Sequence, residues 1–216
     1  LTNNQREDIR ARIEAFQNKP LISVVMPTYN PPIDLLDQAI QSVRAQLYSN
    51  WELCIADDAS PNPEVRKLLQ KHAAQDARIK FVLRETNGHI SAASNSALQL
   101  ATGEFIALLD HDDLLAEHAL FWVVDAINAH PTAGLIYSDE DKIDLDGTRH
   151  SPYFKCDWNP DLFLSHNMIS HLGVYRTELV NQVGGFQIGY EGSQDHDLAL
   201  RCIEKLSDSQ IIHIPR

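Results

Sequence analysis

Carboxylates gather at the ends of the predicted strands, and carboxylate oxygens are ligands that hold divalent cations in proteins. Asp57 and Asp58 follow one short apolar run, and Asp110, Asp112 and Asp113 follow another. Because the carboxyl ends of parallel strands lie at one edge of a sheet, we expect these five side chains to lie near one another. Crowded carboxylates repel, so the pattern predicts a divalent metal ion between them.

Asp110 and Asp112 form a D-x-D motif directly after the apolar segment 104–109. In an extended backbone residues i and i+2 point to the same side, which predicts that both carboxylates face one Mn²⁺ or Mg²⁺ ion. The alternative is that they cap a helix beginning near residue 114, a position that acidic residues favour. The second acidic strand end, at Asp58, favours the metal site.

Asp58 and Tyr29 are candidates for binding a nucleoside. A carboxylate can accept a hydrogen bond from the imide N–H of uracil or thymine, and an aromatic ring stacked on a base contributes about 1–3 kcal/mol. Each residue also has a structural interpretation. Asp57 and Asp58 can form a turn ahead of Ser60, and Tyr29 can be a partly buried loop aromatic.

Asp195 is the candidate general base. It belongs to the sequence QDHD, residues 194–197, which opens a helix predicted over 194–205 behind Ser193. A carboxylate at a helix N-terminus is stabilised as the anion, and an anion there can take a proton from an acceptor hydroxyl. The alternative is a capping cluster without a chemical role.

Histidines are scattered, and three of them, His89, His111 and His171, lie in predicted loops near these carboxylates. A single histidine in such a place is more often structural or solvated than a ligand. Residues 140–175 are expected to shape the pocket for a second substrate, and four aromatic residues there either stack on sugar rings or pack in the core: Tyr153, Phe154, Trp158 and His171.

Short apolar runs alternate with amphipathic segments along the first two thirds of the chain. Strands are predicted over 21–26, 51–56, 79–83, 104–109 and 134–138, and helices over 5–18, 35–47, 64–74, 91–101 and 116–129. Asp34 is the predicted N-cap of the second helix. This alternation predicts a doubly wound, mostly parallel sheet. Residues 140–165 are irregular, and a strand over 169–175, a helix over 177–183 and a strand over 211–214 are expected after them.

Composition narrows the functional classes. The net charge of −12 argues against a nucleic-acid binder, which would carry a basic surface. The three cysteines lie far apart and form no C-x-x-C pair, so we expect reduced thiols and a cytoplasmic location, which includes a peripheral position at the inner face of the membrane. No apolar run reaches the ~20 residues that a membrane span needs. The chain begins at Leu1 and ends directly after an apolar run, so we expect a piece of a longer protein.

These motifs together resemble glycosyltransferase family 2, whose members have the GT-A fold. The matching segments follow the family's order: ISVVMPTYN (22–30), ELCIADDAS (52–60), ETNGHISAASNSALQLATGEFIALLDHDDLL (85–115), GLIYSDEDK (134–142), VGGF (183–186) and GSQDHDLALR (192–201). Each motif is weak alone, but the ordered set is highly specific. The subgroup that it most resembles builds bacterial O-antigens, capsules and other surface glycans.

The resemblance implies an α/β protein with a GT-A domain over residues 21–216. Residues 1–20 would form an N-terminal helical extension, residues 21–139 the nucleotide-binding half, and residues 140–216 the acceptor-side half. Members of this subgroup are often one module of a multidomain enzyme, so the expected partners include other domains of the same polypeptide.

The resemblance also assigns roles to single residues. The loop 87–91 would close on the nucleotide, and the nucleotide-binding residues would be Pro27, Thr28, Tyr29, Asp58, Ser91, Asp110 and His111. Asp110 and Asp112 would hold Mn²⁺ or Mg²⁺, and Asp195 would be the catalytic base. The family usually has Glu before this Asp, where the chain has Gln194. Many members carry a further histidine just past the last strand, at a position beyond Arg216.

The implied function is an inverting transfer of a sugar from a UDP- or dTDP-sugar to a hydroxyl of a glycan or lipid-linked glycan, in bacterial polysaccharide biosynthesis. A sugar nucleotidyltransferase is a first alternative, but residues 26–32 lack the Gly, Lys and Arg of a triphosphate-binding loop. A second alternative is a non-catalytic, degenerate domain that binds a glycan or a partner. Gln194, in place of the family's usual Glu, is compatible with this alternative.

Overall fold

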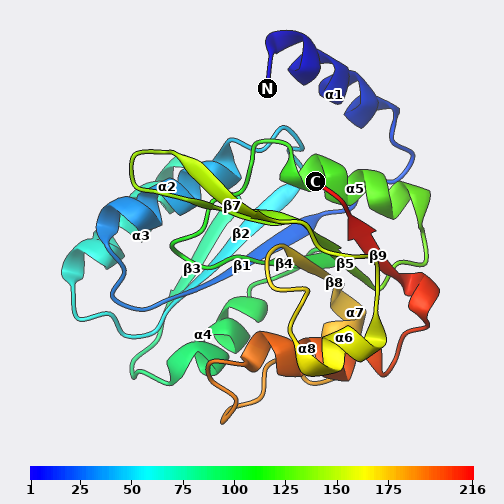
Figure 1. Ribbon diagram of the computed structural model, residues 1–216. Helices are drawn as coiled ribbons and strands as arrows, with labels where there is room; N and C mark the ends of the chain where they lie inside the picture. The colour runs from blue at the N-terminus through cyan, green and yellow to red at the C-terminus, as the bar shows by residue number, and fades with distance from the viewer.

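The computed structural model describes residues 1–216, and seven short strands form its central sheet in the order β3-β2-β1-β4-β8-β5-β9 (Figure 1). Their bounds are β1 Ile22–Thr28, β2 Trp51–Asp57, β3 Ile79–Leu83, β4 Phe105–Leu108, β5 Leu135–Ser138, β8 Gly173–Arg176 and β9 Ile211–Ile214. β1 and β2 are buried along their whole length, because helices cover both faces of the sheet. The predicted α/β fold with a mostly parallel sheet is therefore confirmed.

Helices form a layer on each face of the sheet (Figure 1). The bounds are α1 Asn3–Ala15, α2 Ile33–Arg44, α3 Pro63–Gln75, α4 His89–Leu98, α5 Ala119–Ala129, α6 Pro160–Ser165, α7 Thr177–Gln182 and α8 Gln194–Ile203. One hydrophobic cluster joins the sheet to α1, α2, α3 and α5, and the other joins it to α4, α6, α7 and α8. Residues of β1 alternate between the two clusters, with Val24 in the first and Val25 in the second, as strand geometry requires.

β8 is the one strand that runs antiparallel to its neighbours, between β4 and β5. All the other pairings in the sheet are parallel. The direction of the crossovers changes at β1, which pairs with β2 on one side and with β4 on the other. In an open sheet of this kind the crevice for a ligand lies beyond the carboxyl ends of the strands at such a switch point.

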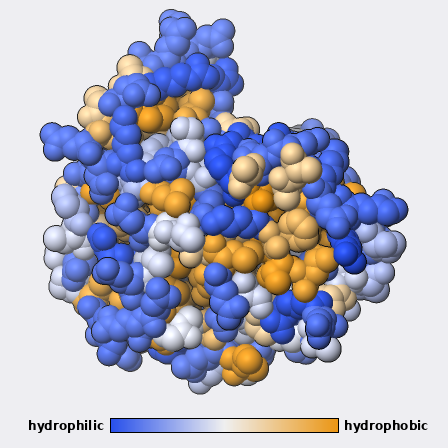
Figure 2. Space-filling view, turned by 180° about the vertical axis from the view of Figure 1, so that it is seen from behind, coloured by the Kyte–Doolittle hydropathy of each residue, from blue (hydrophilic) through white to orange (hydrophobic).

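α1 packs on α5 through polar contacts and two buried isoleucines. Thr2 and Gln5 form a capping box at its start, and Arg6 donates to both carboxylate oxygens of Glu117 at 2.8 Å. Ile9 and Ile13, four residues apart on one face, join the core. Seen from behind, α1 is a mostly hydrophilic lobe that stands out from the body, and hydrophobic side chains gather over the middle of that face (Figure 2).

The observed bounds correct several sequence predictions. Pro32, not Asp34, is the N-cap of α2, and Asp34 lies in the first turn. α5 begins at Ala119 rather than near residue 116. The region expected to be irregular holds a hairpin, β6 Glu140–Ile143 and β7 Arg149–Tyr153, followed by α6. None of the helices combines the length and the apolar composition that a membrane crossing requires.

Candidate active site

A cavity of about 220 Å³ lies beyond the ends of β1 and β4, at the switch point of the sheet. Its lining brings together residues from distant parts of the chain, among them Pro27, Ser94, Asp110, His171, Phe186 and Asp195. Antiparallel β8 explains this composition. β4 contributes the residues that follow it, whereas β8 contributes those that precede it, so both segments reach one rim.

Asp58 ties the loop before α4 to the end of β2. Its side chain is 2% exposed, and its Oδ1 accepts a hydrogen bond from Nε of Arg84 at 2.7 Å. The backbone N–H of Gly88 donates to both carboxylate oxygens, at 3.0 and 3.1 Å. Asp57, by contrast, forms the turn, because it accepts hydrogen bonds from the amide and hydroxyl of Ser60. Oδ2 accepts only from Gly88, but the side chain is buried and Asp58 does not line the cavity.

Two buried hydroxyls near the cavity have no hydrogen-bond partner. Thr28 ends β1 and Ser91 lies in the first turn of α4, and the hydroxyls of both are unpaired. A buried polar group without a partner costs about 1–3 kcal/mol. Neither hydroxyl lines the cavity, but each residue directly follows one that does, Pro27 or Ile90. Tyr29, next to Thr28, is 51% exposed, so its side chain is accessible for stacking on a ring of a ligand.

The residues after β4 form a turn, not an extended segment. The N–H of Asp113 donates to the carbonyl of Asp110 at 3.3 Å, and in such a turn the first and fourth residues approach each other. Asp110 and Asp113 therefore face the same side, together with His171. The expectation that Asp110 and Asp112 point together assumed an extended backbone. Asp112 instead borders a second hollow, of about 390 Å³, between α2 and the hairpin.

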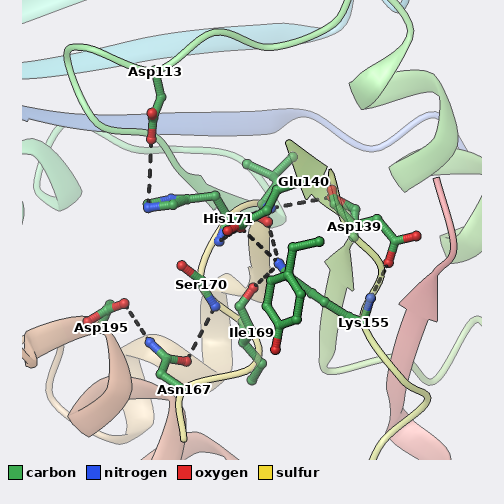
Figure 3. A network of polar contacts seen from close by, with 12 residues as sticks. Asp113, Asp139, Glu140, Lys155, Asn167, Ile169, Ser170, His171 and Asp195 are labelled. Atoms are coloured by element: carbon green, nitrogen blue, oxygen red, sulfur yellow. Dashed lines mark hydrogen bonds and ion pairs between the residues drawn. The ribbon is translucent and has the colours of Figure 1, made fainter. Parts of the chain in front are cut away.

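One ligand atom from each of Asp110, Asp113 and His171 lies within 4.8 Å of the other two. Nε2 of His171 is 3.8 Å from Oδ2 of Asp110. It is 3.7 Å from Oδ2 of Asp113 (Figure 3). These distances are too long for hydrogen bonds. Two carboxylates and an imidazole that surround a shared space are a donor set that fits a divalent cation. The helix-capping alternative for Asp110 and Asp112 is wrong, because the N-cap of α5 is His118.

The two carboxylates of the cluster have raised pKa values, although their side chains are 44% exposed. Burial raises the pKa of Asp110, the charge of His171 partly offsets the rise, and Asp112 and Asp195 add to it. Burial likewise raises the pKa of Asp113, again against His171 and together with Asp110. A raised carboxyl pKa means that the anions lack compensation, which a cation would supply.

Asp195 lies in the first turn of α8 and lines the same cavity. Nδ2 of Asn167 donates to its Oδ2 at 2.7 Å, and the backbone N–H of Ser170 donates to Oδ1 of Asn167 at 3.3 Å (Figure 3). The other oxygen of Asp195 has no such bond to Asn167. Ser193 occupies the N-cap position, but its side chain makes no capping hydrogen bond.

The neighbours of Asp195 have separate tasks. The carboxylate of Asp197 pairs with Arg201 one turn later at 2.6 Å, and Nε2 of His196 lies 2.9 Å from the carbonyl of Phe163. Gln194 lines the cavity beside Asp195, and its Oε1 accepts from the N–H of Gly192 at 2.7 Å. Of the QDHD sequence, only its first two residues therefore face the cavity.

Asn167 joins the site without having been singled out from the sequence, and Asp113 and His171, which were expected nearby, take the place of Asp112 beside Asp110. The third Asp of the run after β4 was a visible signal for Asp113. The aromatic candidates divide: the ring of Trp158 packs on Phe163 at 5.3 Å, whereas Phe154 is 77% exposed. None of the three cysteines forms a disulfide, as expected, and burial raises the pKa of Cys54 and of Cys202 to about 12.

Comparison with solved structures gives the fold. The chain superposes on residues 1–349 of Staphylococcus aureus TarS in complex with UDP-GlcNAc with a TM-score of 0.73 and 21% identity, over 90% of this chain and 56% of that one. The mannosyltransferase PcManGT from Pyrobaculum calidifontis, in complex with GDP-Man and Mn²⁺, gives 0.67 and 20%, over 98% and 63%. The GT-A fold expected from the sequence is confirmed.

Two curated relatives are closer in sequence. The uncharacterized protein y4gI of Sinorhizobium fredii is 56% identical over 98% of this chain, and the O-antigen biosynthesis protein RfbC of Myxococcus xanthus is 37% identical over 94%. The chain spans only 24% and 16% of their lengths. Residues 23–184 match the family model described as glycosyl transferase family 2. Because that match covers well over half of the chain, the protein belongs to glycosyl transferase family 2.

Proposed function

We propose that this chain is the catalytic domain of an inverting glycosyltransferase that uses a UDP- or dTDP-sugar and a divalent cation. The observation that carries the proposal is the lining of one cavity, where the unsatisfied carboxylate of Asp110 and the candidate base Asp195 face a common space. A transferase needs both a place for the diphosphate charge and a base for the acceptor hydroxyl.

The nucleoside is proposed to lie along the ends of β1 and β2. Pro27 lines the cavity and Tyr29 offers a half-exposed ring. Asp58, which is buried, is proposed to accept from an imide N–H through Oδ2, whose partner in the free protein is Gly88. Thr28 and Ser91 supply hydroxyls that lack partners within the protein. The contact of His111 with the nucleotide stays a prediction from the sequence. An acceptor at Asp58 favours uracil or thymine, since cytosine has no N–H at that ring position.

The cation is proposed to be held by Asp110, Asp113 and His171, with Asp112 on the opposite side of the turn. This donor set favours Mn²⁺ over Mg²⁺, because Mg²⁺ strongly prefers oxygen ligands. When bound, the ion would neutralise charge on the departing diphosphate. Asp112 remains a candidate ligand of the same ion through a movement of the turn or a bridging water.

Asp195 acts as the base in a single displacement. It takes the proton of the acceptor hydroxyl as that oxygen forms a bond to the anomeric carbon. The bond from the anomeric carbon to the diphosphate oxygen breaks, and its electron pair leaves with the nucleoside diphosphate. Asn167 holds Oδ2 of Asp195, which leaves Oδ1 to receive the proton. Attack from the face opposite the diphosphate inverts the anomeric configuration.

The biological setting is proposed from the relatives. One of them is named for O-antigen biosynthesis, so we propose a glycan or lipid-linked glycan acceptor and a role in bacterial polysaccharide synthesis at the cytoplasmic side of the membrane. Because the chain is a small part of that relative, further domains of the same polypeptide are proposed to contribute to acceptor binding.

A nucleotide-sugar panel tests the function. Calorimetry with UDP, dTDP, GDP and CDP should show binding of UDP or dTDP that needs Mn²⁺, and the matching sugar donors should release nucleoside diphosphate when an acceptor is present. Binding without turnover on any donor and acceptor would favour the degenerate domain. No Mn²⁺-dependent binding of any nucleotide would overturn the proposal.

A further inference from the structure

The segment 167–171 lies between the candidate base, Asp195, and the candidate cation site at Asp113 (Figure 3). At its start, the side chain of Asn167 donates to Asp195 at 2.7 Å. At its end, the imidazole of His171 faces Asp110 and Asp113. Any shift of these five residues would therefore move the base and a cation ligand together.

This segment is not held by regular secondary structure. It precedes β8, and its fourth residue, Ser170, has a φ of +38°, in the left-handed region that non-glycine residues adopt only at a cost of about 1–3 kcal/mol. A backbone in this conformation persists when surrounding contacts hold it in place. The hydrogen bond from Ser170 N–H to Asn167 is 3.3 Å long, so it is too weak to do this alone.

Lys155 supplies the missing support. Its side chain is fully buried, and Nζ donates to the carbonyl of Ile169 at 2.7 Å and to that of His171 at 2.5 Å. Its third acceptor is Glu140, at 3.1 Å, whose carboxylate also accepts from the N–H of His171 at 3.1 Å. The two carbonyls lie on either side of Ser170, so one ammonium group clamps the strained residue from both directions.

The chemistry of the ammonium group suits this task. A lysine ammonium carries three donors and no acceptor, and here all three donors find oxygen. Burial lowers the pKa of Lys155, and the charge and hydrogen bond of Glu140 counter this effect. An uncharged amine could not donate to all three oxygens at once. Glu140 supplies the counter-charge beside Nζ, and Nζ bridges the carbonyls of Ile169 and His171.

We propose that Lys155 is a positioning residue of the transfer reaction: its buried ammonium group fixes the segment 167–171 and, through it, the relative placement of His171 and Asp195. This role rests on the proposed function of the cavity. The geometry predicts that Lys155 acts on two readouts at once, the affinity for Mn²⁺ through His171 and the turnover rate through Asn167 and Asp195.

Lys155→Met tests the proposal, with Lys80→Met as the matched control. Lys80 also donates to a buried carboxylate, Glu52 at 2.5 Å, but at the opposite end of the sheet. Lys155→Met should weaken Mn²⁺ binding at least tenfold, measured by electron paramagnetic resonance of free Mn²⁺. At saturating Mn²⁺ and donor it should lower kcat at least thirtyfold, with the donor KM changed less than threefold. Lys80→Met should change neither property.

A merely structural lysine gives a different result. Its variant would melt at a lower temperature and yet bind Mn²⁺ and turn over normally below the melting transition, and that outcome overturns the proposal. Because Lys155→Met leaves the carboxylate of Glu140 without its cationic partner, the double variant Lys155→Met/Glu140→Gln removes the uncompensated charge and should show the same two losses. If neither variant folds while Lys80→Met does, Lys155 is a folding residue and the proposal is wrong.

The Mn²⁺ readout separates this proposal from the proposed function. If the wild-type chain transfers no sugar, the transferase assignment fails. A loss of Mn²⁺ affinity in Lys155→Met, with none in Lys80→Met, would still support the clamp on His171.

Discussion

Carboxylates occur at both ends of the sheet, and their surroundings differ. Glu52 at the amino end is 5% exposed, whereas Asp110 and Asp113 at the carboxyl end are 44% exposed. At the amino end, Glu52 accepts from Lys80, from Ser23 Oγ at 2.7 Å and from the N–H and hydroxyl of Thr102. Burial alone would raise the pKa of Glu52, but these hydrogen bonds lower it. At the carboxyl end, Asp110 and Asp113 have raised pKa values.

The difference separates a structural carboxylate from a ligand-binding one. Because hydrogen-bond donors of the protein occupy the carboxylate oxygens of Glu52, this side chain has no acceptor position left for a ligand. Its contribution is to the stability of the fold. Lack of satisfaction at Asp110 and Asp113 costs stability in the free protein, which a bound cation would recover through linkage. Burial and the number of protein hydrogen-bond donors both distinguish the two ends: Glu52 is 5% exposed and accepts from several donors, whereas Asp110 and Asp113 are 44% exposed and face His171.

Asp195→Asn should have the largest effect of any single change. The amide keeps the shape of the side chain but cannot accept a proton, so we expect kcat to fall by about 10²–10⁴-fold. Calorimetry of UDP with Mn²⁺ should be nearly unchanged. A variant that retains more than about a tenth of the turnover would rule out Asp195 as the base.

Glu52→Ala should affect stability and leave the cavity intact. It removes the acceptor for Lys80, Ser23 and Thr102, and we expect the free energy of unfolding to fall by about 2–4 kcal/mol, measured by urea denaturation. UDP binding of the folded protein should match the wild type. A selective loss of nucleotide binding would break the division between the two ends of the sheet.

Asp113→Asn and Asp112→Asn, as a pair, sharpen the assignment of the cation ligands. Because Asp113 faces His171 and Asp112 borders the other hollow, Asp113→Asn should weaken Mn²⁺-dependent UDP binding about tenfold more than Asp112→Asn. Calorimetry measures both. The reverse order would restore the D-x-D pair as the ligands and would require the turn to rearrange when the cation binds.

The pH dependence of stability should differ in sign between the two ends. The folded-state pKa of Asp110 and Asp113 is raised, so without metal their destabilising effect should grow as pH rises above about 3.8, the unfolded value, and be complete above the folded value. Glu52 has a lowered pKa, so its contribution is present above about 4.5 and is lost as pH falls.

Melting curves of metal-free protein measure this effect, which we expect to be the smallest of the four. Asp110→Asn/Asp113→Asn should melt higher than the wild type at pH 7, and the difference should shrink toward pH 4. A double variant that melts lower at pH 7 would show that the two carboxylates are satisfied after all.

The sheet could be predicted from the sequence because its strands are short, apolar and β-branched. The ranges 79–83 and 211–214 match β3 and β9, and the helices were placed to within a few residues at most ends. The direction of β8 could not be predicted, because a run of apolar residues does not show which strands it pairs with or whether the pairing is parallel or antiparallel.

The site was predictable where it follows from strand ends and not where it depends on tertiary contacts. Asp110 and Asp195 stand out because each directly follows or opens an element. The pairing of Asp113 with His171 depends on a turn and on a contact between residues far apart in the chain. Nothing in the sequence distinguishes Lys155 from a surface lysine, and only the fold shows that its side chain is buried.

The antiparallel strand has a consequence for how enzymes of this kind can be altered. Residues that follow β1, β2 and β4 and residues that precede β8 meet at one rim, yet they belong to separate stretches of the chain. Exchange of the stretch 154–172 between related enzymes would therefore change the face presented to the acceptor without disturbing the strands proposed to bind the donor. A chimera that keeps Lys155, Asn167 and His171 is the version of this exchange that we expect to retain turnover.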